Sequence, residues 1–325
     1  MVSEFEQIAR IRKKLGAPKS DVIVGIGDDA AVVRVGKQPL VATVDALVES
    51  VHFDLAYVLP EEVGHRALAV NLSDLAAMGA RAKYALVSLS LPPEKSERFV
   101  SGFYQGLAAL AKKQGVQVIG GNLARSPGPI FVDVTALGEA DTPVLRSGAQ
   151  AGDAIAVVGR LGEAAAGLRL LRSMGRDNAL SKWERLCRAQ LLPQPLLEEG
   201  RFLGKGVATS LIDVSDGLAS ELGHIATASK VRMQIETERL PLSPVLAEAA
   251  ARLSLRPLDL VLYGGEDYAL LFTFRPRDWK KVHARFGDQV TVIGQVRRGP
   301  ARLSIIKAGK SYRLAAAGFD HFRSP

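Results

Sequence analysis

The sequence predicts two domains that each combine strands and helices, in an α+β or α/β organisation. The chain has 325 residues, enough for two domains of ordinary size with an apolar core in each. Strand-like apolar runs alternate with helical patterns of about a dozen residues in both halves. Small and turn-forming residues gather at 144–153. We therefore expect one domain over 1–148 and a second over 149–325.

Composition excludes several classes of function. Hydrophobic residues make up 47% and charged residues 23% of the chain, which is typical of globular proteins. The apolar runs are strand-sized and the first residues lack a signal-peptide pattern, so we expect a cytoplasmic protein that binds no membrane. The single cysteine, Cys187, excludes an internal disulfide and argues against a thiolate metal site. The basic residues behind the net charge of +8 are scattered, so we expect small anionic ligands and no nucleic acid.

In the first half, each element follows from local pattern. Apolar residues at helical spacing predict a helix over 3–15. A second helix begins at Pro60, where Glu61 and Glu62 suit the helix dipole, and ends before Gly79. The remaining predictions are strands at 22–24, 30–35, 39–44, 82–91, 116–119 and 130–137, and a helix at 93–114. A glycine turn is expected directly after 116–119.

The second half repeats this mixture. Residues 172–192 are polar and give no clear assignment, and a glycine turn is expected at 264–268. The predicted strands are 154–158, 207–212, 269–274, 290–296 and 303–306, and the predicted helices are 163–174, 218–229 and 276–286. Both halves are thus mixed, as the fold class requires.

Acidic residues recur at the ends of apolar runs. A hairpin turn explains the acids at 25–29 equally well when that stretch is taken alone. Capping of the helix at 218–229 by Ser215 or Asp216 explains one acid there, but it does not explain Asp213. Carboxylates that converge repel one another unless divalent cations lie between them, and hard oxygen ligands favour magnesium. The acids in question are Asp28, Asp29, Asp45, Asp74, Asp213 and Asp216.

These acids favour phosphate chemistry without a general base. The sequence has no Walker motif and no protein-kinase signature, so a nucleotide would be held by metal ions and by Arg146. An alcohol acceptor would need a base to take its proton. A phosphate acceptor is already ionised, and cations relieve the repulsion between the two anions. Many carboxylates and no obvious base fit the second case.

Six motifs carry a resemblance to a known family. They are Gly-Ile-Gly-Asp-Asp-Ala-Ala at 25–31, Val51-His52-Phe53, Val-Asn-Leu-Ser-Asp-Leu-Ala-Ala-Met-Gly at 70–79, Arg146-Ser147-Gly148-Ala149, Asp-Val-Ser-Asp-Gly-Leu at 213–218, and Gly264-Gly265-Glu266-Asp267-Tyr268. In this order and spacing they are specific, and they cover nearly the whole chain. The chain resembles the thiamine-monophosphate kinase family, in the superfamily of aminoimidazole ribonucleotide synthetase.

The resemblance implies a fold, a reaction and a site. The fold is a homodimer joined through N-terminal mixed sheets, with a C-terminal α/β domain beside each site. The reaction is direct transfer of the γ-phosphate of ATP to thiamine monophosphate with several Mg²⁺ ions, giving thiamine diphosphate and ADP, and it uses no side chain as an acid or base. The implied magnesium site comprises Asp29, Thr43, Val44, Asp45, Asp74, Asn122, Asp213 and Asp216. The implied nucleotide contacts are Gly121, Asn122, Arg146 and Ser215, and the implied thiamine contacts are His52, Glu266 and Phe319.

Three positions depart from the family pattern. The family usually has Gly-Gly-Asp-Thr-Thr-Arg where this chain has Gly-Gly-Asn-Leu-Ala-Arg at 120–125, so Asn122 replaces an aspartate. Val44 replaces a common threonine, and Ala269 a common glutamate. Our hypothesis is that Asn122 binds magnesium more weakly than an aspartate would. The alternatives are a weakened or inactive protein that binds thiamine phosphates, or another ATP-using member of the superfamily.

Overall fold

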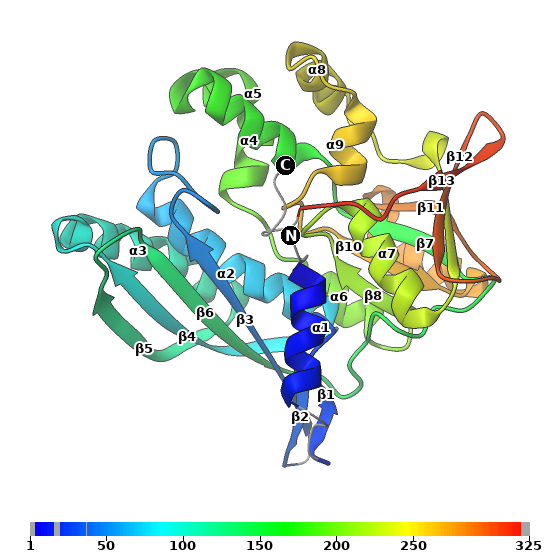
Figure 1. The fold of residues 1–325 in the computed structure, drawn as a ribbon, viewed down its shortest axis with the longest axis horizontal. Helices are drawn as coiled ribbons and strands as arrows, with labels where there is room; N and C mark the ends of the chain where they lie inside the picture. The colour runs from blue at the N-terminus through cyan, green and yellow to red at the C-terminus, as the bar shows by residue number, and fades with distance from the viewer. Residues whose placement is uncertain (1–3, 16–19, 37, 320–325) are drawn as a thin grey trace.

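A computed structural model describes residues 4–15, 20–36 and 38–319 (Figure 1). The first half forms a six-stranded mixed sheet in the order β1-β2-β3-β6-β4-β5. All neighbouring strands are antiparallel except β4 and β5, which are parallel. The strands are β1 (Val22–Val24), β2 (Ala31–Val35), β3 (Gln38–Val48), β4 (Arg81–Leu91), β5 (Gln117–Arg125) and β6 (Phe131–Glu139).

Two long helices cover one face of this sheet. Helix α2 (Pro60–Ala77) packs on β3 and β6, and α3 (Ser96–Gln114) packs on α2. The two helices approach closely at glycines, because a Cβ atom on Gly64 or Gly106 would lie 1.8 Å from a carbonyl oxygen of the facing helix. A shorter helix, α1 (Glu4–Leu15), precedes the sheet, and the 3-10 turn η1 (Pro93–Lys95) leads into α3. The apolar core of this half therefore lies between the sheet and the two helices α2 and α3, on one face of the sheet.

The second half forms a seven-stranded sheet in the order β13-β12-β9-β11-β7-β10-β8. It too is mixed, since β12 and β9 are parallel and the other pairs are antiparallel. Strand β10 is buried along its whole length, which explains why its sequence is apolar apart from Thr273. The strands are β7 (Ala154–Val158), β8 (Ala208–Asp213), β9 (Arg232–Glu236), β10 (Leu270–Phe274), β11 (Val290–Arg297), β12 (Arg302–Lys307) and β13 (Lys310–Leu314).

The helices of the second half pack around this sheet (Figure 1). Helix α7 contacts β8, β9 and β12, α10 contacts β11, and α4 packs on α5, α8 and α9. The helices are α4 (Glu163–Met174), α5 (Arg176–Leu191), α6 (Leu197–Leu203), α7 (Leu218–Ser229), α8 (Pro244–Arg252), α9 (Pro257–Tyr263) and α10 (Trp279–Phe286). Three 3-10 turns complete the fold, η2 (Thr237–Arg239), η3 (Pro276–Asp278) and η4 (Gly287–Gln289).

Most predicted elements are present within a residue or two of the expected bounds. The expected glycine turn after 116–119 is wrong, because β5 continues through Gly120 and Gly121 to Arg125. The pairing with β4 shifts register between Val118 and Gly120, so the strand carries a bulge at the first glycine instead of ending. The unassigned segment 172–192 contains α5, which has a kink at Trp183 that obscures its helical pattern. The pattern analysis also missed α6, α8, α9, β9 and β13.

Helix α2 lies where the two sheets meet. Besides its own sheet it contacts α6 and the edge strand β8 of the second sheet. The predicted boundary at residues 148 and 149 lies in a stretch without helix or strand between β6 and β7, and it stays a prediction. Among the described residues, no helix is both long and apolar enough to cross a bilayer. Because α2 contacts both sheets, the carboxylate of Asp74 on this helix lies at the junction of the two halves.

Candidate active site

Three of the predicted acids converge at this junction. Asp29 comes from the loop between β1 and β2, Asp74 from α2, and Asp213 from the last position of β8. One carboxylate oxygen of each lies within 4.8 Å of one carboxylate oxygen of the other two. The three side chains come from distant parts of the chain, since Asp29 and Asp213 are 184 residues apart. The prediction that these three acids share one site is thus consistent with the geometry.

Hydroxyl groups fix the orientation of two of these carboxylates. The Oγ1 atom of Thr43 donates a hydrogen bond to Oδ2 of Asp74 over 2.5 Å. The Oγ atom of Ser73 donates to Oδ2 of Asp213 over 2.5 Å. Ser73 is fully buried, and its bond joins α2 to the end of β8. The carboxylates are therefore held in place before any ligand binds.

Burial and mutual repulsion make these acids hard to ionise. Burial raises the pKa of Asp74 well above its usual range, and the nearby charges of Asp45, Asp213 and Asp29 raise it further. Burial and the charge of Asp29 raise the pKa of Asp213 to about 8. Burial also raises the pKa of Asp29, against the opposing attraction of Arg146. Such a cluster needs positive charge to ionise near neutral pH.

Arg146 supplies part of that charge. Its Nη2 atom donates a hydrogen bond to Oδ1 of Asp29 over 2.7 Å, and its backbone N–H lies 3.3 Å from both carboxylate oxygens of Asp28. Burial alone would lower the pKa of Arg146, but the charge and hydrogen bond of Asp29, together with the charges of Glu221 and Asp28, outweigh it and the pKa is raised. Burial and the charge of Asp29 raise the pKa of Asp28 to about 6. Both acids of the Gly-Asp-Asp stretch therefore contact the linker between the halves.

The donor set fits a hard divalent cation. The Oδ2 atom of Asp29 is buried and has no hydrogen-bond partner among the described residues. A buried carboxylate oxygen left without a partner is costly, and a cation would relieve that cost. Asp29, Asp74 and Asp213 offer carboxylate oxygens only, which suit Mg²⁺ better than softer metals.

Two further predicted acids lie close to this cluster. Asp45 follows Thr43 by two positions on β3, so both side chains point to the same face of the sheet, and its charge raises the pKa of Asp74. Asp216 lies in the loop before α7, where its backbone N–H donates to Oε1 of Glu221 over 3.0 Å. Ser215 precedes it, and its carbonyl oxygen accepts from the backbone N–H of Glu266 over 2.6 Å.

The residues expected to contact thiamine lie on three separate loops. Glu266 is in the loop between α9 and β10 and has a φ of 70°, which is unusual for a residue with a side chain. Phe319 is 52% exposed, and its backbone N–H donates to the carbonyl of Asp216 over 3.2 Å. His52 lies in the turn after β3, where its Nδ1 accepts from the backbone N–H of Val48 over 3.0 Å. Glu266 and Phe319 thus border the Asp213 to Asp216 loop.

Three predicted positions are not brought to the cluster within one chain. Gly121 and Asn122 lie on β5, which is separated from β3 by β6 and β4. Three strand spacings place them about 14 Å from β3 across the sheet. Val44 points to the sheet face opposite Thr43 and is 56% exposed, so only its main chain could approach a ligand beside Thr43.

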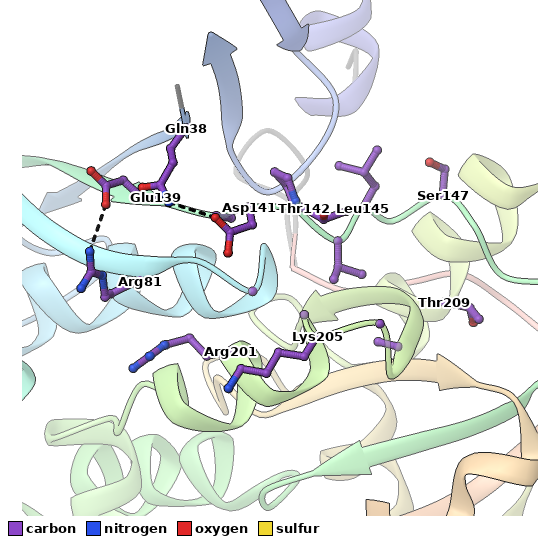
Figure 2. A pocket seen from close by; sticks show the side chains of 17 residues that line it. Gln38, Arg81, Glu139, Asp141, Thr142, Leu145, Ser147, Arg201, Lys205 and Thr209 are labelled. Carbon is purple, nitrogen blue, oxygen red and sulfur yellow. Dashed lines mark hydrogen bonds and ion pairs between the residues drawn. The ribbon is translucent and has the colours of Figure 1, made fainter. Parts of the chain in front are cut away.

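A separate cavity of about 730 Å³ lies between the two halves (Figure 2). Leu145 and Ser147, the neighbours of Arg146 in the linker, line it. Figure 2 shows Arg201 and Lys205 of the second half facing Arg81 of the first half across this space. Its charged residues belong to none of the predicted site sets. Further lining residues are Gln38, Glu139, Asp141, Thr142 and Thr209.

Family models and relatives identify the family. The model described as AIR synthase related protein, N-terminal domain, matches residues 27–140, and the corresponding C-terminal domain model matches residues 150–305. The thiamine-monophosphate kinase of Bacillus subtilis (strain 168) is 38% identical over 331 residues, which cover 99% of this chain and 100% of that protein. The chain belongs to the thiamine-monophosphate kinase family. The thiamine-monophosphate kinase of Escherichia coli (strain K12) is 35% identical over 99% of both chains.

Solved structures of the family share the architecture. The structure described as AaThiL complexed with AMPPCP and TMP superposes with a TM-score of 0.87 at 34% identity, covering 99% of this chain and 97% of that one. The thiamine-monophosphate kinase from Stenotrophomonas maltophilia K279a gives a TM-score of 0.77 at 37% identity, covering 94% of this chain and 96% of that one. The hydrogenase maturation protein HypE in complex with ATP, at 20% identity and a TM-score of 0.70, covers 87% of both chains and shares the fold alone. The predicted family and fold class are confirmed.

Three buried residues of the site were missed by sequence reasoning. Ser73 is next to Asp74 in a recognised motif, but a serine there gives no signal of its own. Glu221 is a buried acid one turn into α7, and it resembles an ordinary helix acid in sequence. Arg66 is a buried cation two turns before Asp74, on an otherwise apolar stretch of α2. A charge on an apolar helix is a signal that could have marked Arg66.

Proposed function

We propose that this chain transfers the γ-phosphate of ATP directly to thiamine monophosphate, giving thiamine diphosphate and ADP. The observation that carries this proposal is the convergence of Asp29, Asp74 and Asp213 within 4.8 Å, with a buried and unpartnered oxygen on Asp29. Relatives named thiamine-monophosphate kinase match over the full chain, and a similar structure is described as complexed with AMPPCP and TMP. The proposal includes a cytoplasmic location, where ATP is available.

Magnesium is the proposed cofactor, and within one chain its proposed ligands are six of the eight residues that the resemblance implied, without Val44 and Asn122. Carboxylates of Asp29, Asp74 and Asp213 would hold it, with Asp45, Asp216 and Thr43 beside them. Bound there, magnesium ions would neutralise the phosphate oxygens and align the attacking and leaving groups.

The chain's own residues have three tasks in this scheme. Thr43 and Ser73 hold the carboxylates of Asp74 and Asp213 in fixed orientations. Arg146, held between the two halves, is placed to bind phosphate oxygens once it leaves Asp29. No side chain acts as a general base, because the attacking oxygen belongs to a phosphate that is already ionised.

A homodimer is the second part of the proposal. The face of the first sheet opposite α2 and α3 exposes the apolar side chains of Val44, Tyr84, Leu86 and Phe131. On edge strand β5, Asn122 lies opposite Ser88 of β4 and so belongs to the same face. Exposed apolar side chains gathered on one sheet face favour an interface between copies of the chain. Pairing through this sheet could bring β5 of one chain to the site of the other.

This arrangement would account for the position of Asn122 and Gly121. Both lie about 14 Å from β3 in their own chain. In a dimer paired through the sheets, they would serve the partner's site. Leu86→Arg tests this point, because a buried charge would disfavour pairing. We expect a monomer by light scattering with little activity, and an active monomer would contradict the proposal.

The deciding assay measures thiamine diphosphate formed by the purified protein from ATP, thiamine monophosphate and magnesium. We expect product with one ADP released for each thiamine diphosphate. If the chain is instead a binding homologue weakened by Asn122, it will bind thiamine monophosphate in calorimetry and consume no ATP. ATP hydrolysis that does not depend on thiamine monophosphate would indicate another reaction of the superfamily.

A further inference from the structure

A buried arginine on α2 contacts one of the residues expected to bind the substrate. The side chain of Arg66 is 4% exposed, and its guanidinium forms an ion pair with Oε1 of Glu266. Arg66 belongs to the first half of the chain and Glu266 to the second, so the pair crosses the junction. A buried arginine needs such a partner, because an unpaired charge in the interior is costly.

The Glu266 carboxylate is held at its other oxygen as well. The Nε2 atom of Gln190, a buried residue of α5, donates to Oε2 of Glu266 over 2.8 Å. Each carboxylate oxygen therefore has one partner from the protein, the guanidinium of Arg66 at Oε1 and the amide of Gln190 at Oε2, and keeps a lone pair. The Glu266 side chain is still 28% exposed. It can accept further hydrogen bonds from a ligand without leaving Arg66 or Gln190.

The backbone around Glu266 is fixed in an unfavourable conformation. Glu266 and Tyr268 have φ angles of 70° and 49°, in the left-handed region that costs residues with a Cβ atom free energy. Their backbone N–H groups donate to the carbonyls of Ser215 and Val214 over 2.6 and 2.9 Å. The loop is thus tied to the segment that carries Asp213 and Asp216. Strain of this kind persists where the surroundings hold it, and it is frequent at functional sites.

We propose that Arg66 is a positioning residue for the organic substrate, and that together with Gln190 it holds the Glu266 carboxylate as an oriented hydrogen-bond acceptor. Arg66 partly neutralises the charge of Glu266. The orientation of the carboxylate, and not its charge alone, therefore selects the donor groups of the substrate. The expected ligand is the heterocyclic part of a thiamine phosphate, whose pyrimidine ring carries an amino group and whose thiazolium ring carries a positive charge. This inference rests on the proposed function, in which Glu266 contacts that part of the substrate.

The same helix provides a matched control. Glu62, one turn before Arg66 on α2, forms a bidentate ion pair with Arg176 of α5, with N to O distances of 2.7 and 2.8 Å. This pair also joins the two halves, but it does not include Glu266. If Arg66 only docked the halves together, removal of either arginine would have the same kinetic effect.

The experiment compares Arg66→Met, Arg66→Lys and Arg176→Met with the full-length wild type. We expect Arg66→Met to raise KM for thiamine monophosphate about tenfold or more, because a hydrogen bond to a charged group no longer has its geometry. KM for ATP is expected to stay within about twofold. Arg66→Lys keeps the charge and should recover part of the loss, while Arg176→Met should leave both KM values unchanged. Thermal unfolding of each variant reports its stability separately.

A double-mutant cycle gives a second readout. Glu266→Gln should raise the same KM, and Arg66→Met combined with Glu266→Gln should be no worse than Glu266→Gln alone. The proposal would be overturned if the increases in KM for thiamine monophosphate were additive, or if KM for ATP rose by the same factor. Should a variant fail to fold, Gln190→Leu tests the same carboxylate from its other oxygen. If the wild type makes no thiamine diphosphate, the proposed function is refuted. If the wild type is active and Arg66→Met changes the two KM values equally, this inference alone is refuted.

Discussion

The carboxylate cluster and the cavity of Figure 2 both lie between the two halves, but they differ in how far their charged side chains are paired. In the cluster, three buried carboxylates approach one another and an oxygen of Asp29 has no partner. In the cavity, Arg81 pairs with Glu139 and Arg201 with Glu198, at 3.1 and 2.8 Å. Gln38 donates to Asp141 over 3.0 Å. The cavity's charges, Lys205 excepted, are thus satisfied by the protein and do not call for a ligand, whereas like charges held together do.

The largest expected difference between the two regions is in catalysis. Asp74→Asn keeps the shape of the side chain and removes one of the converging charges. We expect kcat to fall about 100- to 1000-fold, since metal-assisted charge stabilisation is worth several kcal/mol. Asp141→Asn, the same change in the cavity, should leave kcat within about twofold. Equal losses in the two variants would remove the distinction between the regions.

A second prediction concerns stability without metal. Folding raises the pKa of Asp213 from 3.8 to about 8, so the folded protein holds this proton more tightly than the unfolded chain. The resulting stabilisation is complete below about pH 4 and is lost as the pH rises through about 8. We expect the Tm of metal-free protein to fall over this range, and Asp213→Asn should reduce the pH dependence of the Tm. Thermal unfolding in EDTA at several pH values measures both.

Magnesium should reverse this loss of stability. It binds the ionised carboxylates, so it competes with protons and should raise the Tm more at pH 8.5 than at pH 6. At about 100 times its Kd the stabilisation is about 2.7 kcal/mol, which corresponds to several degrees in Tm. Asp213→Asn should show a much smaller rise. A magnesium effect independent of pH would contradict the assignment of the cluster as the metal site.

A smaller effect is expected at Asn122, the departure from the family pattern. Asn122→Asp restores a carboxylate, so we expect the magnesium concentration that gives half-maximal activity to fall a few-fold. Leu123→Asp is the control, because Leu123 is exposed and lies opposite the buried Leu89 of β4, so it adds the same charge next to Asn122 on the other face of the sheet and should leave the magnesium dependence unchanged. An unchanged metal dependence in Asn122→Asp would refute the hypothesis that this position weakens metal binding.

The smallest effect is expected for the cavity's own ion pair. Arg81→Gln removes the contact with Glu139, in which the side chains are 57% and 32% exposed. Exposed pairs contribute about 0 to 1 kcal/mol, so the free energy of unfolding should change by less than about 1 kcal/mol. Activity should remain at the wild-type level. A large loss of activity would show that this cavity takes part in the reaction after all.

The cavity and the cluster also differ in how visible they were in the sequence. Asp29, Asp74 and Asp213 each follow a recognisable apolar run, and their motifs match one family, so their chemistry could be predicted residue by residue. The cavity's residues are scattered over α6, β4 and the linker and share no pattern. Gln190 likewise looks like an ordinary helix residue, although it is buried.

The sequence by itself determined the two mixed domains, most strands and helices, the candidate acids and the family. These follow from periodicity, turn residues and motif spacing, which are local properties of the chain. The tertiary structure decided which acids meet, that Ser73 and Thr43 orient them, and that Arg66 joins Glu266 across the junction. It also placed Asn122 on an edge strand three strands from β3. Strand order and helix packing are set by contacts between distant residues, and no local pattern encodes them.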